Sequence, residues 1–336
     1  MTEPNAALAS ERIVITRRDH LELQPWRIAA PAIGEVRVRV AYSAVSFGDI
    51  MLRRHVFRQR PAVAVPGYEV VGTIDAVGAG VTAMRPGDRV AALLEYGGNA
   101  RHALVRAGDT VALPAGVDDA RAAAAVLNYA TALAMLEEAG LVAGDRLLVH
   151  GASGGVGSAM LDTARALGLS ALGTTRGDLR RDLFGARLLD ARSPSLVDDV
   201  RAASGGGVRA VFDGRAGRGL WRSRAMVKRG GSLIVFGLSS LATRGPGAVL
   251  GTAGMLASLA LFRVLPGKRS AMFAIDKIYR RDPARVQAWV TRAIDLLAAG
   301  AIAPIVGATL PLDQAAEAHR LVETGQIVGK VVLDCR

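Results

Sequence analysis

A glycine-rich turn between a short apolar run and a helical segment constrains this chain more than any other feature. Residues 150–157 read His-Gly-Ala-Ser-Gly-Gly-Val-Gly, the apolar run 147–149 precedes them, and 158–167 carries small and apolar side chains at helical spacing. Ala152, Gly154 and Gly157 fit the A/G-x-G-x-x-G pattern, in which glycines let the backbone turn tightly and approach a pyrophosphate. The order strand, turn, helix therefore predicts a dinucleotide site at the helix N-terminus.

The residues after the next apolar run indicate which dinucleotide binds. The predicted strand 170–175 ends about where such sites hold the adenosine ribose. Sites for NAD have Asp or Glu there, whereas this chain has Thr174, Thr175 and Arg176. An acid would repel a 2′-phosphate, while hydroxyls and a guanidinium would bind it. We therefore predict NADPH, and the alternative is that Arg176 is an ordinary surface arginine.

Bulk properties exclude several classes of protein. A length of 336 residues predicts two domains. The single cysteine, Cys335, excludes a disulfide framework and fits a cytoplasmic protein. Residues 1–10 lack the features of a signal peptide. The run 247–262 is shorter than the roughly 20 apolar residues that a membrane span needs, so we expect a buried or lid helix there and no membrane association.

The net charge of +12 raises the question of nucleic-acid binding. The positive residues are mostly arginines scattered along the chain, and only 4% of residues are aromatic. We therefore do not expect nucleic acid as the main partner. A positive field would still favour anionic cofactors and substrates.

The pattern along the chain changes near residue 117. Residues 11–115 read as short strands with frequent turn signals, which predicts a compact barrel-like unit. Helices then alternate with short apolar strands, which predicts a doubly wound parallel sheet. Its expected strands are 147–150, 171–174, 188–189, 210–213, 233–236 and 270–275. A helix 283–299, a strand 303–310, a helix 312–324 and a strand 330–334 follow, and the last strand is expected to return to the first unit.

These stretches together resemble the medium-chain dehydrogenase/reductase superfamily, in its zinc-free quinone oxidoreductase (zeta-crystallin-like) branch. Besides the glycine turn, the matching stretches are 34–36, 45–49, 66–72, 86–90, 127–132 and 328–333. The resemblance implies an α/β fold in which a Rossmann doubly wound parallel sheet is inserted in a GroES-like β-rich catalytic domain. The expected domains are 125–276 for the nucleotide and 1–124 plus 277–336 for catalysis. A homodimer is also implied.

Departures from the zinc-dependent relatives predict a site without zinc. Ser46 stands where those relatives have a catalytic cysteine, Tyr68 stands where they have a histidine, and the cysteine expected near residue 127 is absent. Zinc needs three or four N, S or O ligands in a fixed cage. The five histidines show no ligand spacing, and we expect each to be structural or exposed.

The resemblance implies hydride transfer from NADPH to a quinone or an α,β-unsaturated carbonyl, with a small apolar substrate. An enoyl or polyketide-tailoring reductase in specialised metabolism is one alternative. A non-catalytic, crystallin-like protein that binds NADPH or RNA is another. Phe57 stands where enoyl-thioester reductases have a tyrosine thought to assist protonation, which counts against that reading.

The same resemblance suggests which residues form the site. Ser46, Phe47, Phe57 and Asn128 are expected in the substrate pocket. Tyr68 or Tyr129 is the candidate proton donor, and a packed tyrosine is the alternative for each. The expected cofactor contacts are Thr131, Ser153, Gly154, Gly155, Val156, Thr174, Arg176, Gly237, Leu238 and Lys330, although Lys330 also reads as a surface lysine. The insertion 241–268 is expected to cover the pocket, to form a subunit contact or to pack in the core.

Overall fold

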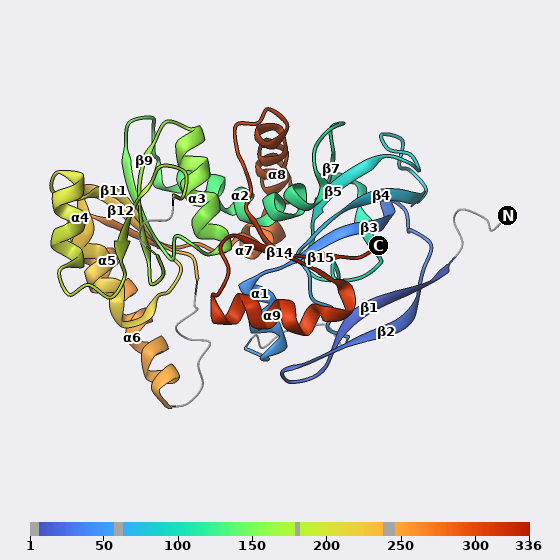
Figure 1. Cartoon of the computed structure of the whole chain (residues 1–336), viewed down its shortest axis with the longest axis horizontal. Coiled ribbons are helices and arrows are strands. Elements are labelled where there is room, and N and C mark those ends of the chain that lie inside the picture. Colours follow the sequence, from blue (N-terminus) through green and yellow to red (C-terminus); the bar gives the residue numbers. More distant parts are fainter. Residues whose placement is uncertain (1–6, 57–62, 179–181, 238–245) are drawn as a thin grey trace. The chain divides into compact units, whose positions relative to one another are not determined.

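The chain forms two compact units, which Figure 1 shows in a computed structural model that describes residues 7–56, 63–178, 182–237 and 246–336. Unit 1 contains Met1–Ala130 and Asp276–Arg336, and unit 2 contains Thr131–Ile275. The first crossing between the units lies within helix α2 (Asp119–Ala139), and the second lies at the start of α7 (Ile275–Arg281). Unit 2 is therefore an insertion in unit 1.

Unit 2 is built on a parallel sheet of six strands. Their order across the sheet is β10 (Arg187–Asp190), β9 (Ser170–Thr175), β8 (Arg146–His150), β11 (Val208–Asp213), β12 (Val227–Val235) and β13 (Arg269–Met272). The helices that accompany these strands are α3 (Gly155–Ala166), α4 (Leu196–Ser204), α5 (Leu220–Met226) and α6 (Pro246–Val264). The chain order reverses between β8 and β11, and ligands of such sheets bind outside the carboxyl ends of the strands at that point.

The predicted doubly wound parallel sheet is confirmed, with shifted boundaries. Leu147, Leu148 and Val149 of β8 are fully buried, as expected for a parallel strand with helices on both faces. Helix α3 begins at Gly155, three residues before the predicted start at 158, because the last glycines of the turn already adopt helical geometry. Strand β12 begins at Val227, six residues before the predicted 233.

Unit 1 contains a seven-stranded mixed sheet and a separate hairpin. The sheet order is β14 (Val306–Pro311), β15 (Lys330–Asp334), β3 (Glu35–Val45), β4 (Glu69–Val77), β5 (Arg89–Leu93) and β7 (Thr110–Ala112), and β6 (His102–Arg106) also pairs with β3. Strands β1 (Leu8–Arg17) and β2 (His20–Ile28) form the hairpin. The helices of this unit besides α2 and α7 are α1 (Phe47–Arg53), α8 (Pro283–Ala298) and α9 (Ala315–Thr324). Three 3₁₀ turns are described in the chain, at Ala107–Asp109, Gly217–Gly219 and Leu312–Gln314.

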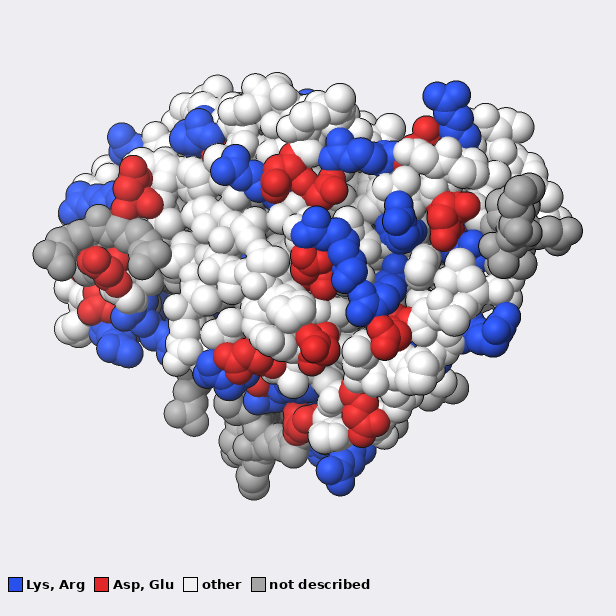
Figure 2. All heavy atoms as spheres, turned by 45° about the vertical axis from the view of Figure 1, so that its right-hand side comes forward, with Lys and Arg blue, Asp and Glu red and all other residues white. Residues whose placement is uncertain are grey.

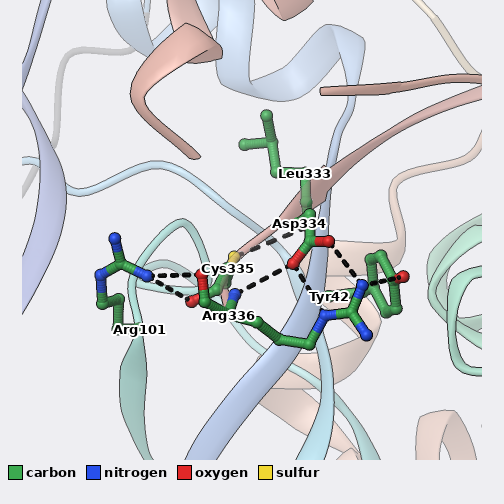
Figure 3. Close-up of polar contacts among 6 residues, drawn as sticks. All are labelled: Tyr42, Arg101, Leu333, Asp334, Cys335 and Arg336. Atoms are coloured by element: carbon green, nitrogen blue, oxygen red, sulfur yellow. Dashed lines mark hydrogen bonds and ion pairs between the residues drawn. The ribbon is translucent and has the colours of Figure 1, made fainter. Parts of the chain in front are cut away.

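The last strand returns to unit 1, as the sequence predicts. Strand β15 pairs antiparallel with β3 and parallel with β14. The residues after it are held by charged side chains, as Figure 3 shows. Arg101 donates to the carbonyls of Cys335 at 3.2 Å and Arg336 at 2.7 Å, while the Arg336 guanidinium donates to Asp334 at 2.6 Å and to the Tyr42 hydroxyl at 2.8 Å. Burial raises the pKa of the Cys335 thiol to about 12, so this cysteine is a packed apolar side chain at neutral pH.

Helix α6 contributes to the core of unit 2. Met255 and Phe262 lie seven residues apart, on one face of the helix, and both are buried in that core. Core packing therefore accounts for these two residues of the insertion, whereas Leu256, Leu261 and Val264 are exposed. Within the described part of the chain, no helix is long and apolar enough to cross a membrane.

Basic and acidic side chains are interspersed on the face of the molecule that Figure 2 draws. Figure 2 shows basic and acidic side chains lying next to one another over the face drawn, rather than a continuous basic stripe on that face. This distribution agrees with the expectation that the positive charge is dispersed.

Candidate cofactor site and polar cluster

The glycine turn lies at the carboxyl end of β8, where the chain order of the sheet reverses. Gly151 has φ +77°, a left-handed conformation that favours glycine. A Cβ on Gly157 would lie 2.1 Å from the Gly151 carbonyl oxygen, so only glycine allows α3 to pack this closely on the turn. The sequence pattern thus corresponds to real steric requirements at these two positions.

The turn offers a cradle for phosphates. Solvent reaches Ser153, Gly154, Gly155 and Val156, the four residues predicted to hold the phosphates. The first N–H groups of α3 have no acceptor within their own helix, and the first turn contains no acidic residue. Free N–H groups together with the helix dipole favour an anion at this position, so the cradle fits a dinucleotide pyrophosphate.

The Thr174 hydroxyl already has a partner inside unit 2. The side chain is fully buried, and Oγ1 lies 2.9 Å from Nδ1 of His150. Its carbonyl oxygen accepts from the N–H groups of Gly151 at 3.1 Å and Ala152 at 2.9 Å. Thr174 therefore holds the start of the glycine turn through its carbonyl oxygen, and its contact with a 2′-phosphate stays a prediction.

His150 extends this network across the point where the strand order reverses. Its Nε2 lies 3.2 Å from Oγ of Ser223, which donates to Asp213 at 2.8 Å. Burial lowers the pKa of His150, so its ring is neutral and bridges β8, β9 and β11. His150 thus has a structural role, which is one of the two roles expected for the histidines. The sequence did not indicate its partners.

The other predicted cofactor residues differ in accessibility. Arg176 is exposed directly after β9. Gly237 follows β12, and a Cβ there would lie 2.3 Å from the carbonyl oxygen of Gly214. Thr131 on α2 is only 6% exposed. Leu238 and the predicted pocket residue Phe57 lie outside the described residues.

A second cluster of functional side chains forms at one edge of the sheet in unit 1. Ser46 directly follows β3, the central strand of the three that meet there, and Glu69 and Lys330 are the first residues of its two neighbours, β4 and β15. The antiparallel register pairs Val331 with Val45, which places Lys330 beside Ser46. Sheet pairing therefore brings together residues that lie far apart in the sequence.

Lys330 joins the other two residues of this cluster. Its Nζ lies 2.5 Å from Oγ of Ser46 and 2.6 Å from Oε1 of Glu69. Lys330 is 3% exposed and Glu69 is fully buried, whereas solvent reaches Ser46. Burial raises the pKa of Glu69, and the adjacent ammonium opposes that shift. Because its ammonium is held inside unit 1, Lys330 is not the surface lysine that the sequence offered as an alternative, while its contact with the cofactor stays a prediction.

Asp49 fixes the backbone around Ser46. Its carboxylate accepts from the N–H groups of Ser46 at 2.8 Å and Gly67 at 2.7 Å. Burial raises the pKa of Asp49 to about 7, although both N–H groups stabilise the charged form. The result is a rigid connection between the end of β3, the start of α1 and the loop before β4.

The remaining predicted pocket residues lie close to this cluster in sequence but differ in exposure. Tyr68 packs against Gly48, since a Cβ on Gly48 would lie 2.9 Å from its hydroxyl oxygen, and burial raises the Tyr68 pKa. Phe47 is partly exposed. On α2, Asn128 is 4% and Tyr129 is 2% exposed, so both are core positions of that helix. Their roles in substrate binding and proton transfer stay predictions.

The cluster does not suit zinc. In the described ranges, which omit 1–6, 57–62, 179–181 and 238–245, no group of three or more His, Cys, Asp or Glu side chains is placed to hold a metal ion. The Lys330 ammonium lies on the Ser46 oxygen, and a positive charge there repels a second cation. The donor set therefore does not fit this metal.

Comparison with known proteins gives the chain its family. Residues 32–116 match the alcohol dehydrogenase GroES-like domain, and residues 185–333 match the family described as zinc-binding dehydrogenase. The quinone oxidoreductase of Rattus norvegicus is 29% identical over 91% of this chain and 91% of its own length.

The chain belongs to the quinone oxidoreductase branch of the medium-chain dehydrogenase/reductase superfamily. A mycobacterial protein solved in complex with NADPH has the same fold, with a TM-score of 0.82 and 28% identity over 96% of this chain and 99% of that one. A mycocerosic acid synthase-like polyketide synthase of Mycolicibacterium smegmatis is 30% identical over 94% of this chain, but the match spans only 15% of the synthase. The predicted fold class and family are thus confirmed.

Proposed function

We propose that this chain is an NADPH-dependent reductase that transfers a hydride to a quinone or an α,β-unsaturated carbonyl without zinc. The observation that carries the proposal is the solvent-accessible glycine turn where the strand order of the doubly wound sheet reverses. The similarity of the chain to quinone oxidoreductases supports the type of reaction. The NADPH complex of the mycobacterial relative supports the choice of cofactor. A small apolar substrate, a cytoplasmic location and a homodimer are parts of the same proposal.

The residues of unit 2 would bind and orient the cofactor, which supplies the hydride when bound. The turn from Ser153 to Val156 would hold the pyrophosphate, with the N–H groups of Gly155 and Val156 as donors, since the Gly154 N–H is donated to the Gly151 carbonyl at 3.0 Å. Arg176 would pair with the 2′-phosphate, because it is exposed just after β9, where this fold places the ribose. The buried His150 network would keep the turn in its binding conformation.

Charge at Arg176 provides the test of cofactor choice. Replacing Arg176 with Ala should weaken NADPH binding about tenfold, because one charged contact to phosphate is lost, and should leave NADH binding unchanged. Arg187→Ala is a matched control, since Arg187 is exposed but begins β10 and so lies at the amino edge of the sheet. Equal affinity of the unmodified protein for NADH and NADPH would contradict the proposed preference.

The acceptor is identified by an assay of NADPH oxidation with quinones, enones and enoyl thioesters. Turnover with quinones or simple enones supports the main proposal. Selective turnover of an enoyl thioester would favour a polyketide-tailoring reductase, which the match to a polyketide synthase supports as the second candidate. Tight NADPH binding with no turnover of any acceptor would indicate a non-catalytic protein.

A further inference from the structure

The cluster at the edge of unit 1 contains a hydroxyl group that is open to solvent on one side and has buried charged side chains on the other. Solvent reaches Ser46, whereas its two partners, Lys330 and Glu69, are buried behind it. Lys330 donates to the Ser46 oxygen, and an oxygen that accepts a charged hydrogen bond becomes a stronger donor of its own proton. The pairing of β15 with its neighbouring strands is made by the backbone and does not involve the ammonium.

Hydride transfer to an enone places negative charge on the carbonyl oxygen, which then requires a hydrogen-bond donor and a proton. When the β-carbon receives the hydride, the electrons of the C=C bond move to the carbonyl oxygen and form an enolate. A donor placed where this charge develops lowers the barrier, and the enolate also requires a proton. The described residues offer no metal site to stabilise that oxygen.

We propose that Ser46 is the catalytic residue that donates a hydrogen bond and then a proton to the substrate oxygen, with Lys330 as the positioning residue and proton source behind it. This inference rests on the proposed reductase function. The Ser46 O–H bond breaks as the enol O–H bond forms, and one Lys330 N–H bond breaks to restore the serine. Solvent then returns one proton to the amine, and the enol tautomerises to the saturated carbonyl compound. The sum is one hydride and one proton added to the enone.

Glu69 keeps this arrangement ready between turnovers. Its carboxylate lies 2.6 Å from Nζ of Lys330, and the nearby Lys330, Leu127 and Ser46 oppose the rise that burial causes in the pKa of Glu69. Because Lys330 occupies the Ser46 oxygen as a donor, the serine proton is available to a substrate oxygen. Glu69 thereby fixes the position of the lysine side chain behind Ser46.

The test compares Ser46→Ala with Ser46→Thr, which keeps the hydroxyl. With an enone and NADPH, Ser46→Ala should lower kcat about 100-fold, whereas Ser46→Thr should stay within about tenfold of the unmodified enzyme. A quinone should show a much smaller loss, because its hydroquinone anion is stable without a proton. Ser43→Ala is the matched control, since Ser43 lies three residues away in β3, is fully buried and donates to Asn99 at 2.7 Å. NADPH affinity should be the same in all three variants.

A second measurement needs no cofactor. 4-Nitrophenol, which changes colour on ionisation, mimics the enolate, so its pKa when bound to the cofactor-free protein reports on the donor at Ser46. Ser46→Ala should raise this pKa by about one unit relative to the unmodified protein. The double variant Lys330→Met/Glu69→Gln removes both buried charges together and should raise it in the same way.

The outcomes separate the two proposals. If the unmodified protein oxidises NADPH with enones and Ser46→Ala does so equally fast, the role of Ser46 is overturned while the reductase function stands. If no acceptor supports turnover, the reductase function fails independently of the 4-nitrophenol result. An unchanged 4-nitrophenol pKa in both Ser46→Ala and the double variant also overturns the inference.

Discussion

His319 makes the stability of unit 1 depend on pH in a way that can be calculated. It lies on α9, which packs on α1, it is fully buried, and neither ring nitrogen has a hydrogen-bond partner among the described residues. Figure 1 shows α1 and α9 next to each other. Burial, reinforced by the charge of Arg53, lowers the imidazole pKa from 6.5 to about 3. Other charged groups at this contact are Arg54, Glu323 and Asp19: Glu323 pairs with both arginines at 2.7–2.8 Å, and Asp19 lies 3.7–3.8 Å from them.

The sign of the effect follows from which state binds the proton. Below pH 6.5 the unfolded chain protonates His319, whereas the folded chain does not until about pH 3. The free energy of unfolding therefore falls as the pH is lowered through this window. Between about pH 7.5 and pH 5, this one group should cost about 2 kcal/mol of stability, since each unit of pKa shift corresponds to about 1.4 kcal/mol.

The assay compares urea unfolding of the protein with that of His319→Leu at both pH values. A Trp221→Phe background leaves Trp26 and Trp289, both in unit 1, as the only tryptophans, so fluorescence reports on that unit. The difference between the two proteins should grow by about 2 kcal/mol in favour of His319→Leu on acidification, while other titrating groups such as Asp49 cancel. His20→Gln, at an exposed position, is the control. If the two stability curves run parallel between these pH values, the reasoning about His319 is refuted.

Two further changes test the buried cluster and the glycine turn. Lys330→Met should lower the free energy of unfolding by about 3–5 kcal/mol, because Glu69 is left as an unpaired buried charge, and adding Glu69→Gln should restore most of it in the same urea assay. If the double variant is no more stable than Lys330→Met alone, loss of the ion pair does not explain the lower stability of Lys330→Met. Gly157→Ala should abolish measurable NADPH binding by calorimetry and lower the melting temperature, because its Cβ would lie 2.1 Å from a carbonyl oxygen. As a control, Gly254→Ala on α6, where a Cβ meets no neighbour, should raise the free energy of unfolding slightly, by about 0.5–1 kcal/mol. If Gly157→Ala is tolerated equally well, the steric argument for the turn is contradicted.

Local features of the sequence were sufficient to predict the doubly wound sheet and its glycine turn. The run 147–149, the glycines after it and the following helix are contiguous, and their geometry depends on sterics within a few residues. The steric demand at Gly157 is of this kind, since its contact is with Gly151 only six residues away. The return of strand 330–334 to the first unit was predicted from the order of elements along the chain, and its pairing with β3 confirms it.

Which polar side chains touch each other was decided only by the tertiary structure. The position of Thr174 relative to the turn is fixed by sequence, but the direction of its side chain depends on the pairing of β8 with β9, which places its hydroxyl beside His150. In the same way, the sequence suggested a cofactor contact or a surface position for Lys330, whereas the tertiary structure buries it beside Glu69 and Ser46. A glutamate and a lysine that each begin an apolar strand were the available signal for a buried pair, but strands 69–77 and 330–334 meet Ser46 only when both join β3. Contacts between residues hundreds of positions apart depend on strand register, and no local pattern encodes that register by itself.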